Sequence, residues 1–300
     1  YMDYQANFFK QCGQSRFSML ADNVKQPFNE YLGLLLNFGI IGLLVLLLLM
    51  VIIIYCYRKN PSVEKQIAFY SLSSIGIFSF FSYPFAYPFV WVVTFLSIFI
   101  ITSEYIKPLF SNILIKKIAC MFILTYSLFG SSKLFERIQA ELDWGKASTL
   151  ALCKSYNETL PTYERLEKMF VSNPYFLYNY AAVLQEMKQY TESLEVALKC
   201  RQYWADYDLE LIIGENYQQL NKPELAEKYY NSASMMCPSR FLPLYKLFHL
   251  YKTNGEKERS LAMAEAVISK PMKIKTTTIR MMKREMEREI QKMNMSIKLE

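Results

Sequence analysis

One stretch of the chain excludes most soluble folds. From Tyr31 to Tyr57 the sequence contains no charged residue, and Asn37 is the only strongly polar side chain within it. A helix needs about 20 apolar residues, each rising 1.5 Å, to cross roughly 30 Å of hydrocarbon. The stretch is therefore predicted to be a membrane-spanning helix.

Three further apolar segments follow it. No charged residue occurs between Gln66 and Ser103, where an aromatic turn containing proline divides the sequence into two candidate spans. The last segment is weaker because Lys116 and Lys117 interrupt its start. It crosses only if these lysines snorkel to the headgroups, and otherwise lies flat in the interface. The predicted membrane domain covers 29–132, with helices at 31–57, 66–83, 85–103 and 112–132.

Basic residues predict the orientation of these spans. Arg58, Lys59 and Lys65 follow the first span, and another group of lysines follows the third, whereas the turn between the second and third carries no charge. Cytoplasmic loops are enriched in Lys and Arg, so both basic loops are expected inside. Residues 1–28 are then the end of an extracytoplasmic loop. The part after residue 132 is also outside if the fourth segment crosses, and cytoplasmic if it does not.

The second half of the chain is dense in charged residues and contains an internal repeat. Ala181, Gly214 and Phe248 are 33 and 34 residues apart, and Ser193, Ala226 and Ser260 each follow 12 residues later. Small residues at such places let paired helices approach closely, while prolines close the units. The period resembles that of the tetratricopeptide repeat. The positions assigned a structural role here are Gly214, Ala226 and Pro238.

This repeat domain is predicted to cover 133–272, and the charged segment 273–300 is predicted to be a capping helix that keeps the stack soluble. The fold class is therefore expected to be all-α, with polytopic transmembrane helices followed by an α-solenoid. The chain starts at Tyr1 without a signal-like pattern, so it is expected to be the C-terminal part of a longer protein.

Cysteine spacing and net charge limit which kinds of functional site the sequence predicts. The six cysteines show no CxxC spacing, so no metal site is predicted and the thiols are interpreted as small buried hydrophobes. The net charge of +7 is spread over loops and helices without a nucleic-acid-binding signature, so no nucleic-acid partner is expected. The basic residues near the spans are better explained as topology signals.

The beginning of the first span carries a motif. The sequence "PFNEYLGLLLNFGIIGLL", from Pro27 to Leu44, has the form Asn-x-x-Leu and, after four further residues, a polar residue, one residue, Gly, two apolar residues and Gly. This pattern resembles the O-antigen ligase/polymerase family of membrane glycan transferases, in which a large periplasmic loop runs into a late transmembrane helix. The charge-free "FFSYPFAYPF" turn also looks like that family, and the likeness covers roughly residues 1–110.

The resemblance implies a bacterial inner-membrane enzyme without cofactor or metal. It would move a glycan from undecaprenyl pyrophosphate to an acceptor, either lipid A-core (a ligase) or a growing glycan (an O-antigen or capsule polymerase). The family's histidine before the Asn-x-x-Leu pattern is absent: Phe28 occupies that position, and the only histidine is His249 in the third repeat.

The candidate site residues follow from this likeness and from the residue chemistry. Asn29 and Glu30 are the catalytic candidates, with Glu30 acting as a base if burial raises its pKa. Each also has a structural interpretation, Asn29 as a helix cap and Glu30 as an interfacial carboxylate. The substrate-binding candidates are Arg16, Lys25, Gln26 and Asn37. The glycines expected to permit close helix packing are Gly39 and Gly42.

Two functions remain open at this point. The first is the glycan transferase, whose repeat domain binds a partner protein. The second is a membrane-anchored tetratricopeptide scaffold without catalytic activity, which the missing histidine favours.

Overall fold

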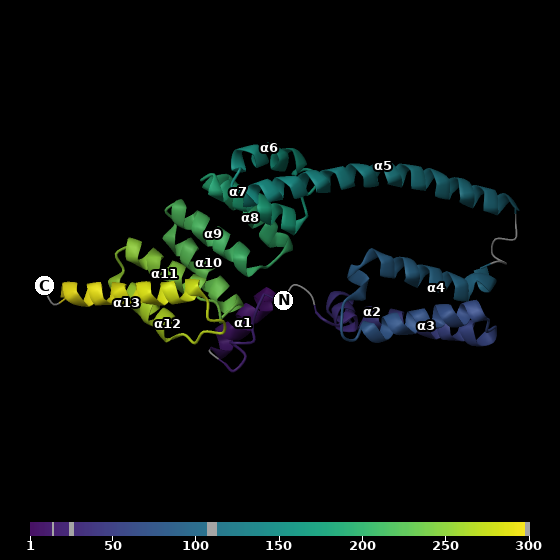
Figure 1. Cartoon of the computed structure of the whole chain (residues 1–300), viewed down its shortest axis with the longest axis horizontal. Coiled ribbons are helices and arrows are strands. Elements are labelled where there is room, and N and C mark those ends of the chain that lie inside the picture. The colour runs from purple at the N-terminus through teal and green to yellow at the C-terminus, as the bar shows by residue number, and fades with distance from the viewer. Residues whose placement is uncertain (14, 24–26, 107–112, 298–300) are drawn as a thin grey trace. The chain divides into compact units, whose positions relative to one another are not determined.

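The computed structural model describes residues 1–13, 15–23, 27–106 and 113–297. Throughout these ranges the regular structure is helical and no strand occurs, so the all-α prediction is confirmed (Figure 1). The helices are, in chain order, α1 (Met2–Cys12), α2 (Glu30–Lys59), α3 (Val63–Phe78), the 3₁₀ turn η1 (Pro84–Ala86), α4 (Pro88–Ile106), α5 (Ile113–Leu152), α6 (Tyr156–Leu166), α7 (Pro174–Glu186), α8 (Tyr190–Tyr203), α9 (Tyr207–Gln219), α10 (Pro223–Met236), α11 (Leu242–Thr253), α12 (Lys257–Ser269) and α13 (Thr277–Ile297).

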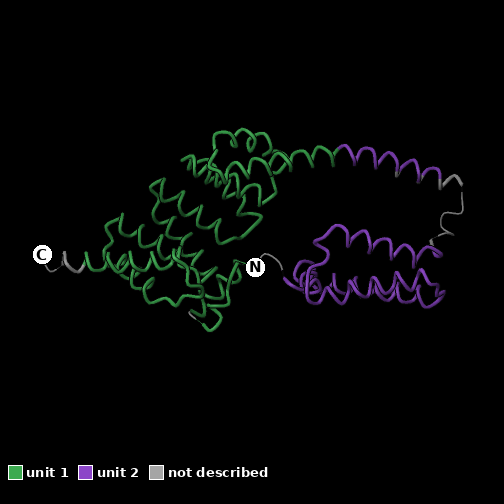
Figure 2. The backbone as a smooth tube through the Cα atoms, in the orientation of Figure 1, with its two compact units in different colours: residues 1–23, 133–300 green, residues 24–132 purple. Residues whose placement is uncertain are grey.

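The chain divides into two compact units (Figure 2). Residues 24–132 form one, called the apolar unit here, and residues 1–23 together with 133–300 form the other, called the repeat unit. The N-terminal segment therefore belongs with the second half of the chain and not with the helix that directly follows it.

Two helices of the apolar unit, α2 and α4, are long and apolar enough to cross a membrane. The helix α2 starts and ends within two residues of the bounds predicted for the first span, 31–57. The end of the second predicted helix and the start of the third differ from the predicted positions. The second helix ends at Phe78 rather than at 83, and the third starts at Pro88 rather than at 85, because the residues between them form turns and a 3₁₀ segment. Pro84 and Pro88 each open a helical segment, where a missing N–H is harmless.

The helices α2, α3 and α4 alternate in direction. At one end the Asn60 side chain donates a hydrogen bond of 2.9 Å to Glu104 at the end of α4, and Lys65 of α3 pairs with the same carboxylate at 3.1 Å. At the other end the Tyr31 hydroxyl of α2 donates to the Gly76 carbonyl of α3 at 2.8 Å. The start of α3 thus meets the ends of α2 and α4, so α3 runs antiparallel to both.

Gly39 does not have the packing role predicted for it. It interrupts α2 with φ 64° and ψ −163°, a conformation that glycine adopts without the penalty of a Cβ, and so produces a kink. A Cβ at Gly39 would meet no described atom within 4 Å, and one at Gly42 would meet Phe38 of the same helix at 2.5 Å. Within the described residues, no neighbouring helix packs against either glycine.

The predicted boundary at residue 132 is wrong as a helix end. The helix α5 continues without interruption from Ile113 to Leu152. No proline occurs in this range, and Gly130 and Gly145 each cost only about 1 kcal/mol in a helix interior. Asn112, the predicted first residue of this helix, lies outside the described ranges.

The repeat unit is built from helical hairpins. The pairs α7–α8, α9–α10 and α11–α12 succeed one another along the stack (Figure 1). Ser193 is fully buried and joins two hairpins: its hydroxyl donates to the Ala181 carbonyl at 2.7 Å and accepts from the Asn216 amide at 2.7 Å. The equivalent Ala226 and Ser260 are also fully buried. The 33- to 34-residue period therefore corresponds to one helical hairpin, as in tetratricopeptide repeats.

Gly214 allows α9 and α10 to approach closely within their hairpin. A Cβ at this position of α9 would lie 2.6 Å from Cε1 of Tyr230 on α10. Tyr230 is itself fully buried, and its hydroxyl donates to Gln218 at 2.9 Å. Only a residue without a side chain leaves room for this ring.

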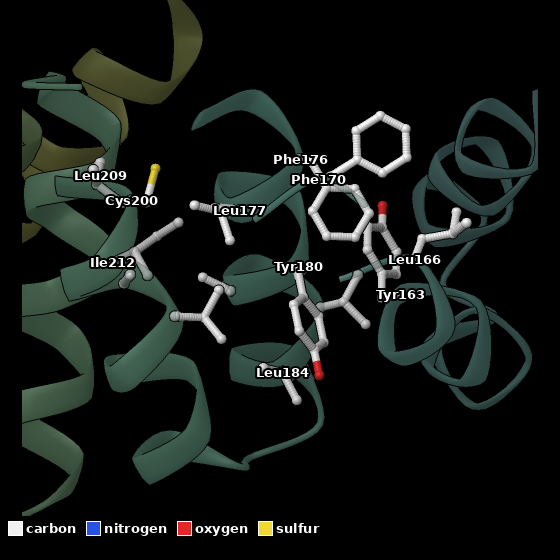
Figure 3. Packing of buried hydrophobic residues seen from close by; sticks show 14 of the residues in the cluster. Tyr163, Leu166, Phe170, Phe176, Leu177, Tyr180, Leu184, Cys200, Leu209 and Ile212 are labelled. Atoms are coloured by element: carbon white, nitrogen blue, oxygen red, sulfur yellow. The ribbon is translucent and has the colours of Figure 1, made fainter. Parts of the chain in front are cut away.

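An aromatic cluster closes the first end of the stack (Figure 3). Tyr163 of α6 stacks on Tyr180 of α7 with ring centroids 5.5 Å apart, and Phe170 stacks on Phe176 at 4.9 Å. Trp144, in the second half of α5, packs against both phenylalanines. The second half of α5 and α6 thus form the leading unit of the stack.

The capping helix is α13, which begins at Thr277. Met286 of α13 is fully buried against Phe248 and Val267, while its charged residues include Glu285, whose carboxylate accepts a hydrogen bond of 2.9 Å from the Tyr245 hydroxyl. One face of α13 therefore covers the last hairpin and the other is polar, which is the arrangement expected of a cap.

Candidate functional site

The two catalytic candidates lie where the helices of the apolar unit converge. Asn29 caps α2, because its Oδ1 accepts from the Leu32 N–H at 2.8 Å, and its side-chain amide donates to the Phe80 carbonyl at 3.0 Å. Glu30 Oε1 accepts from the Phe85 N–H of η1 at 3.1 Å. Both side chains thus fasten the beginning of α2 to the turn between α3 and α4.

Aromatic rings surround this polar junction. Phe28 lies 5.5 Å from Tyr83, and Tyr31 lies 4.4 Å from Phe80, measured between ring centroids. The Trp91 indole donates to the Phe85 carbonyl at 2.8 Å. Tyr and Trp concentrate at membrane–water interfaces because their rings are apolar and their polar atoms bond water or backbone. We call this junction, residues 28–31 with 79–86, the aromatic end of the apolar unit.

Asn37 is not brought to this junction. It lies one to two turns further along α2, roughly 10 Å below Glu30 at 1.5 Å per residue. Its side chain is exposed and has no hydrogen-bond partner within the described residues. Asn37 is therefore an isolated polar residue on an apolar helix, two residues before the kink at Gly39.

Arg16 belongs to the repeat unit. Its guanidinium lies over the Phe17 ring at 4.9 Å from the centroid, and no described carboxylate forms an ion pair with it. Beside it, a hollow of about 350 Å³ is lined by Tyr1, Gln5, Phe8, Phe9, Phe17, Leu20 and Ala21. An unpaired cation next to an apolar, aromatic wall suits an anionic group attached to a sugar or lipid. The other two substrate-binding candidates, Lys25 and Gln26, lie outside the described residues.

Sequence reasoning missed how firmly residues 1–23 are held by the repeat stack. Met2 is 3% exposed and packs against α9 and α10. The Arg240 guanidinium pairs with Asp22 at 2.8 Å, and the Asn23 amide donates to Asp206 at 2.8 Å. The apolar spacing and the acidic residues of this short segment do not indicate which surface of the protein it packs against.

A buried carboxylate lies at the centre of this contact. Arg201 of α8 donates to Asp3 of α1 at 3.2 Å and also pairs with Glu210 of α9. The Glu210 side chain is only 1% exposed, and burial raises its pKa although the nearby Arg201 cation opposes the shift. For Asp22, burial opposes ionisation, but hydrogen bonds from Arg240 and the Asn23 N–H hold its pKa below the usual value.

The prediction that the cysteines are buried holds for three of the six. Cys56, Cys200 and Cys237 are buried, and burial raises the pKa of the Cys200 and Cys237 thiols to about 12. The remaining three are exposed instead of buried: Cys12, Cys120 and Cys153. Cys12 and Cys120 lie on α1 and the first half of α5, which have faces without a neighbour in the described structure, and Cys153 lies in the turn after α5.

His249 takes no part in the junction. It lies in α11 with its ring 4.5 Å from Tyr245 and its Nε2 3.4 Å from a Glu285 oxygen. Burial lowers its pKa, which favours the neutral imidazole. No group of three or more His, Cys, Asp or Glu side chains with metal-binding geometry occurs in the described part of the chain.

Comparison with known proteins finds similar solved structures only. No protein-family model and no curated protein matches the chain. Among solved structures, MamA aligns at 13% identity and a TM-score of 0.41 over 51% of this chain and 88% of its own. MamA from Desulfovibrio magneticus RS-1 gives 18% identity and 0.40 over 49% of this chain and 76% of its own. YrrB, described as a TPR protein with an unusual peptide-binding site, gives 18% and 0.39 over 43% and 66%.

These structures share only a partial likeness of fold with the chain. The tetratricopeptide-like character of the repeat unit rests on its own hairpins and on the buried small residues that recur in them.

Proposed function

We propose that the chain is the C-terminal part of a membrane glycan transferase of the O-antigen ligase kind. It moves a glycan from undecaprenyl pyrophosphate to a lipid or glycan acceptor during surface-polysaccharide synthesis. The observation that carries the proposal is the location of the motif: its first two polar residues, Asn29 and Glu30, lie at the aromatic end of the apolar unit, where α2, α3 and α4 converge.

The residues supply different parts of this chemistry. The pyrophosphate carrier needs a cation, and Arg16 is the candidate from the sequence pattern, although it belongs to the repeat unit and the catalytic candidates belong to the apolar unit. The acceptor hydroxyl needs a group that takes its proton, and Glu30 is the carboxylate of the motif. Asn29 holds the turn in place through its two hydrogen bonds. No metal or cofactor is required for transfer from a pyrophosphate, because the pyrophosphate is a good leaving group.

The proposed location is the bacterial inner membrane, with several crossings. The aromatic end and the repeat unit face the periplasm, and the basic residues Arg58, Lys59 and Lys65 face the cytoplasm. The repeat stack is then in position to receive a protein partner from the same compartment.

A second candidate function, an inactive membrane-anchored scaffold, is favoured by the hydrogen bonds of Asn29 and Glu30. Asn29 and Glu30 both make hydrogen bonds that are sufficient to explain their presence by structure alone. A membrane-anchored tetratricopeptide scaffold without catalytic activity needs nothing more of them.

The deciding experiment compares conservative and disruptive variants in cells that lack the gene. Glu30→Gln keeps an oxygen that accepts from the Phe85 N–H but removes the proton acceptor, whereas Asn29→Ser keeps a cap for α2. We expect Glu30→Gln and Arg16→Ala to abolish transfer at normal protein levels. Gels of surface glycans and of carrier-linked glycans report it: carrier-linked polymer accumulates for a ligase, and glycans of one repeat unit remain for a polymerase.

Asn29→Ser keeps the cap of α2 but loses the amide that donates to the Phe80 carbonyl, so we expect activity to fall only as far as the protein level does. If cells without the gene show wild-type profiles on both gels, the transferase is excluded and the scaffold stands. If Glu30→Gln is fully active, Glu30 is a fastening residue and not the base.

A further inference from the structure

The contact between the N-terminal segment and the repeat stack constrains the path of the chain through the membrane. Within the repeat unit, Met2, Phe9 and Ala21 are all at most 9% exposed. The Gln5 side chain donates to the Met236 carbonyl, and Arg240 pairs with Asp22. Residues before the apolar unit and residues after it therefore share one folded body.

The three helices that follow carry the chain back and forth across the apolar unit. The chain enters at the aromatic end with α2 and leaves α2 beside Lys65 and Glu104. It returns with α3 to the aromatic end, where the Glu30 N–H donates to the Ser79 carbonyl at 2.9 Å. It then departs with α4, whose last residues lie beside the start of α3, where the Lys59 ammonium is 5.5 Å from the Tyr105 ring centroid.

Three passages alone would leave the chain on the side opposite to its start. A folded unit rich in charges does not lie within hydrocarbon, so the repeat unit occupies one side of the membrane only. The number of crossings between residues 23 and 133 is therefore even. We propose that the first half of α5 is a fourth crossing, which returns the chain to the side of residues 1–23. The stack edge that binds residues 1–23 thus has the chain's own loop as its partner.

The first half of α5 lies between Lys117 and Lys133, whose long side chains can reach the headgroups at either end of a crossing. The sequence between Lys117 and Lys133 contains no charge. Among its described side chains, Phe122, Leu124 and Leu128 are each more than 60% exposed. At 1.5 Å per residue, α5 is about 60 Å long, so a passage through roughly 30 Å of hydrocarbon leaves its second half free to pack in the stack.

This inference does not depend on glycan transfer, since an inactive scaffold would follow the same path. Exposed native cysteines provide the test. In the full chain, Cys12 lies at the end of α1, Cys153 follows α5, and Cys120 lies in the proposed crossing. Variants that retain one exposed thiol each, made by Cys→Ser substitution of the other two, are treated with a membrane-impermeant maleimide. Pro61→Cys, in the exposed loop between α2 and α3, supplies the site for the other side.

We expect Cys12 and Cys153 to be labelled from the same side of the sealed inner membrane, and Pro61→Cys only from the opposite side. Cys120 should react only after detergent is added. Labelling of Cys153 together with Pro61→Cys, and not with Cys12, would overturn the proposal. So would equal labelling of Cys120 and Cys153 in sealed membranes, or labelling of all sites from one side.

Discussion

At the scale of single residues, polar side chains on the first turns of α2 have distinct environments. Asn29 caps the helix, and Glu30 holds the turn before α4 through the Phe85 N–H. Asn37 has no partner in the described ranges and lies two residues before the Gly39 kink. Polar groups at a membrane boundary are costly unless they are bonded, and the first two meet this condition through backbone groups of a neighbouring turn.

Gly214 offers the sharpest test at this scale. Gly214→Ala places a methyl group 2.6 Å from the Tyr230 ring, which is fully buried and unable to move without displacing its neighbours. We expect a loss of about 1–3 kcal/mol in the free energy of unfolding, as for other overpacked sites. Chemical denaturation of the detergent-solubilised chain measures it.

The matched control is Gly145→Ala in α5, where a Cβ meets nothing within 4 Å. Alanine is favoured over glycine by about 1 kcal/mol inside a helix, so this variant is expected to be neutral or slightly more stable. Equal effects of the two substitutions would show that contact with Tyr230 is not what requires glycine.

At the scale of elements, α1 behaves as part of the stack although it lies more than a hundred residues away in the sequence. Its acidic residue Asp3 completes a row in which Arg201 lies between an exposed and a buried carboxylate. A buried carboxylate is tolerated when a cation and hydrogen bonds compensate its desolvation. The row therefore links α1, α8 and α9.

Arg201→Ala leaves Glu210 buried without its cation. We expect a loss of about 3–5 kcal/mol at pH 7, as when one partner of a buried ion pair is removed. The pKa of Glu210 is already raised by burial, and loss of Arg201 raises it further. The folded state then binds a proton more readily than the unfolded state, so stability recovers as the pH falls toward 4.5, the ordinary pKa of a glutamate.

Unfolding curves at pH 7 and pH 5 measure this difference. Asp3→Ala is the control: its carboxylate is 51% exposed, so we expect at most about 1 kcal/mol and little pH dependence. A loss in Arg201→Ala that does not change with pH would assign the effect to packing of the arginine stem instead of to Glu210.

At the scale of the whole molecule, the repeat unit is discontinuous in sequence, with the apolar unit inserted between its two parts. Its N-terminal part contributes Met2 to the hydrophobic cluster that contains Tyr230 and Met236 of α10. The two parts are therefore expected to unfold together.

Met2→Asp tests this cooperation. A charge at a position that is 3% exposed should release α1 and cost about 2–5 kcal/mol, similar to loss of a buried methionine side chain. Hydrogen exchange should then become faster not only in α1 but also in α10. Tyr4→Asp, at 81% exposure on the same helix, should change neither. Unchanged exchange in α10 would mean that α1 binds the stack without supporting it.

The sequence alone determined the features that depend on local pattern. The absence of charge between Tyr31 and Tyr57 sets α2, and the recurrence at Ala181, Gly214 and Phe248 sets the repeat, because hydrophobic periodicity and small-residue spacing are properties of consecutive residues. The pattern from Asn29 to Gly42 is likewise a property of consecutive residues, and the glycan transfer inferred from it stays a prediction.

Only the tertiary structure decided which distant groups meet. The pairing of Asp22 with Arg240 and of Asp3 with Arg201 joins residues about two hundred positions apart. The engagement of Glu30 by the Phe85 N–H and the continuation of α5 past residue 132 were also not predictable. Charged side chains on a surface have many possible partners of opposite sign, and helix ends without proline or a strong cap depend on what packs against them. Three-dimensional packing selects among these alternatives because it alone determines which surfaces are buried together.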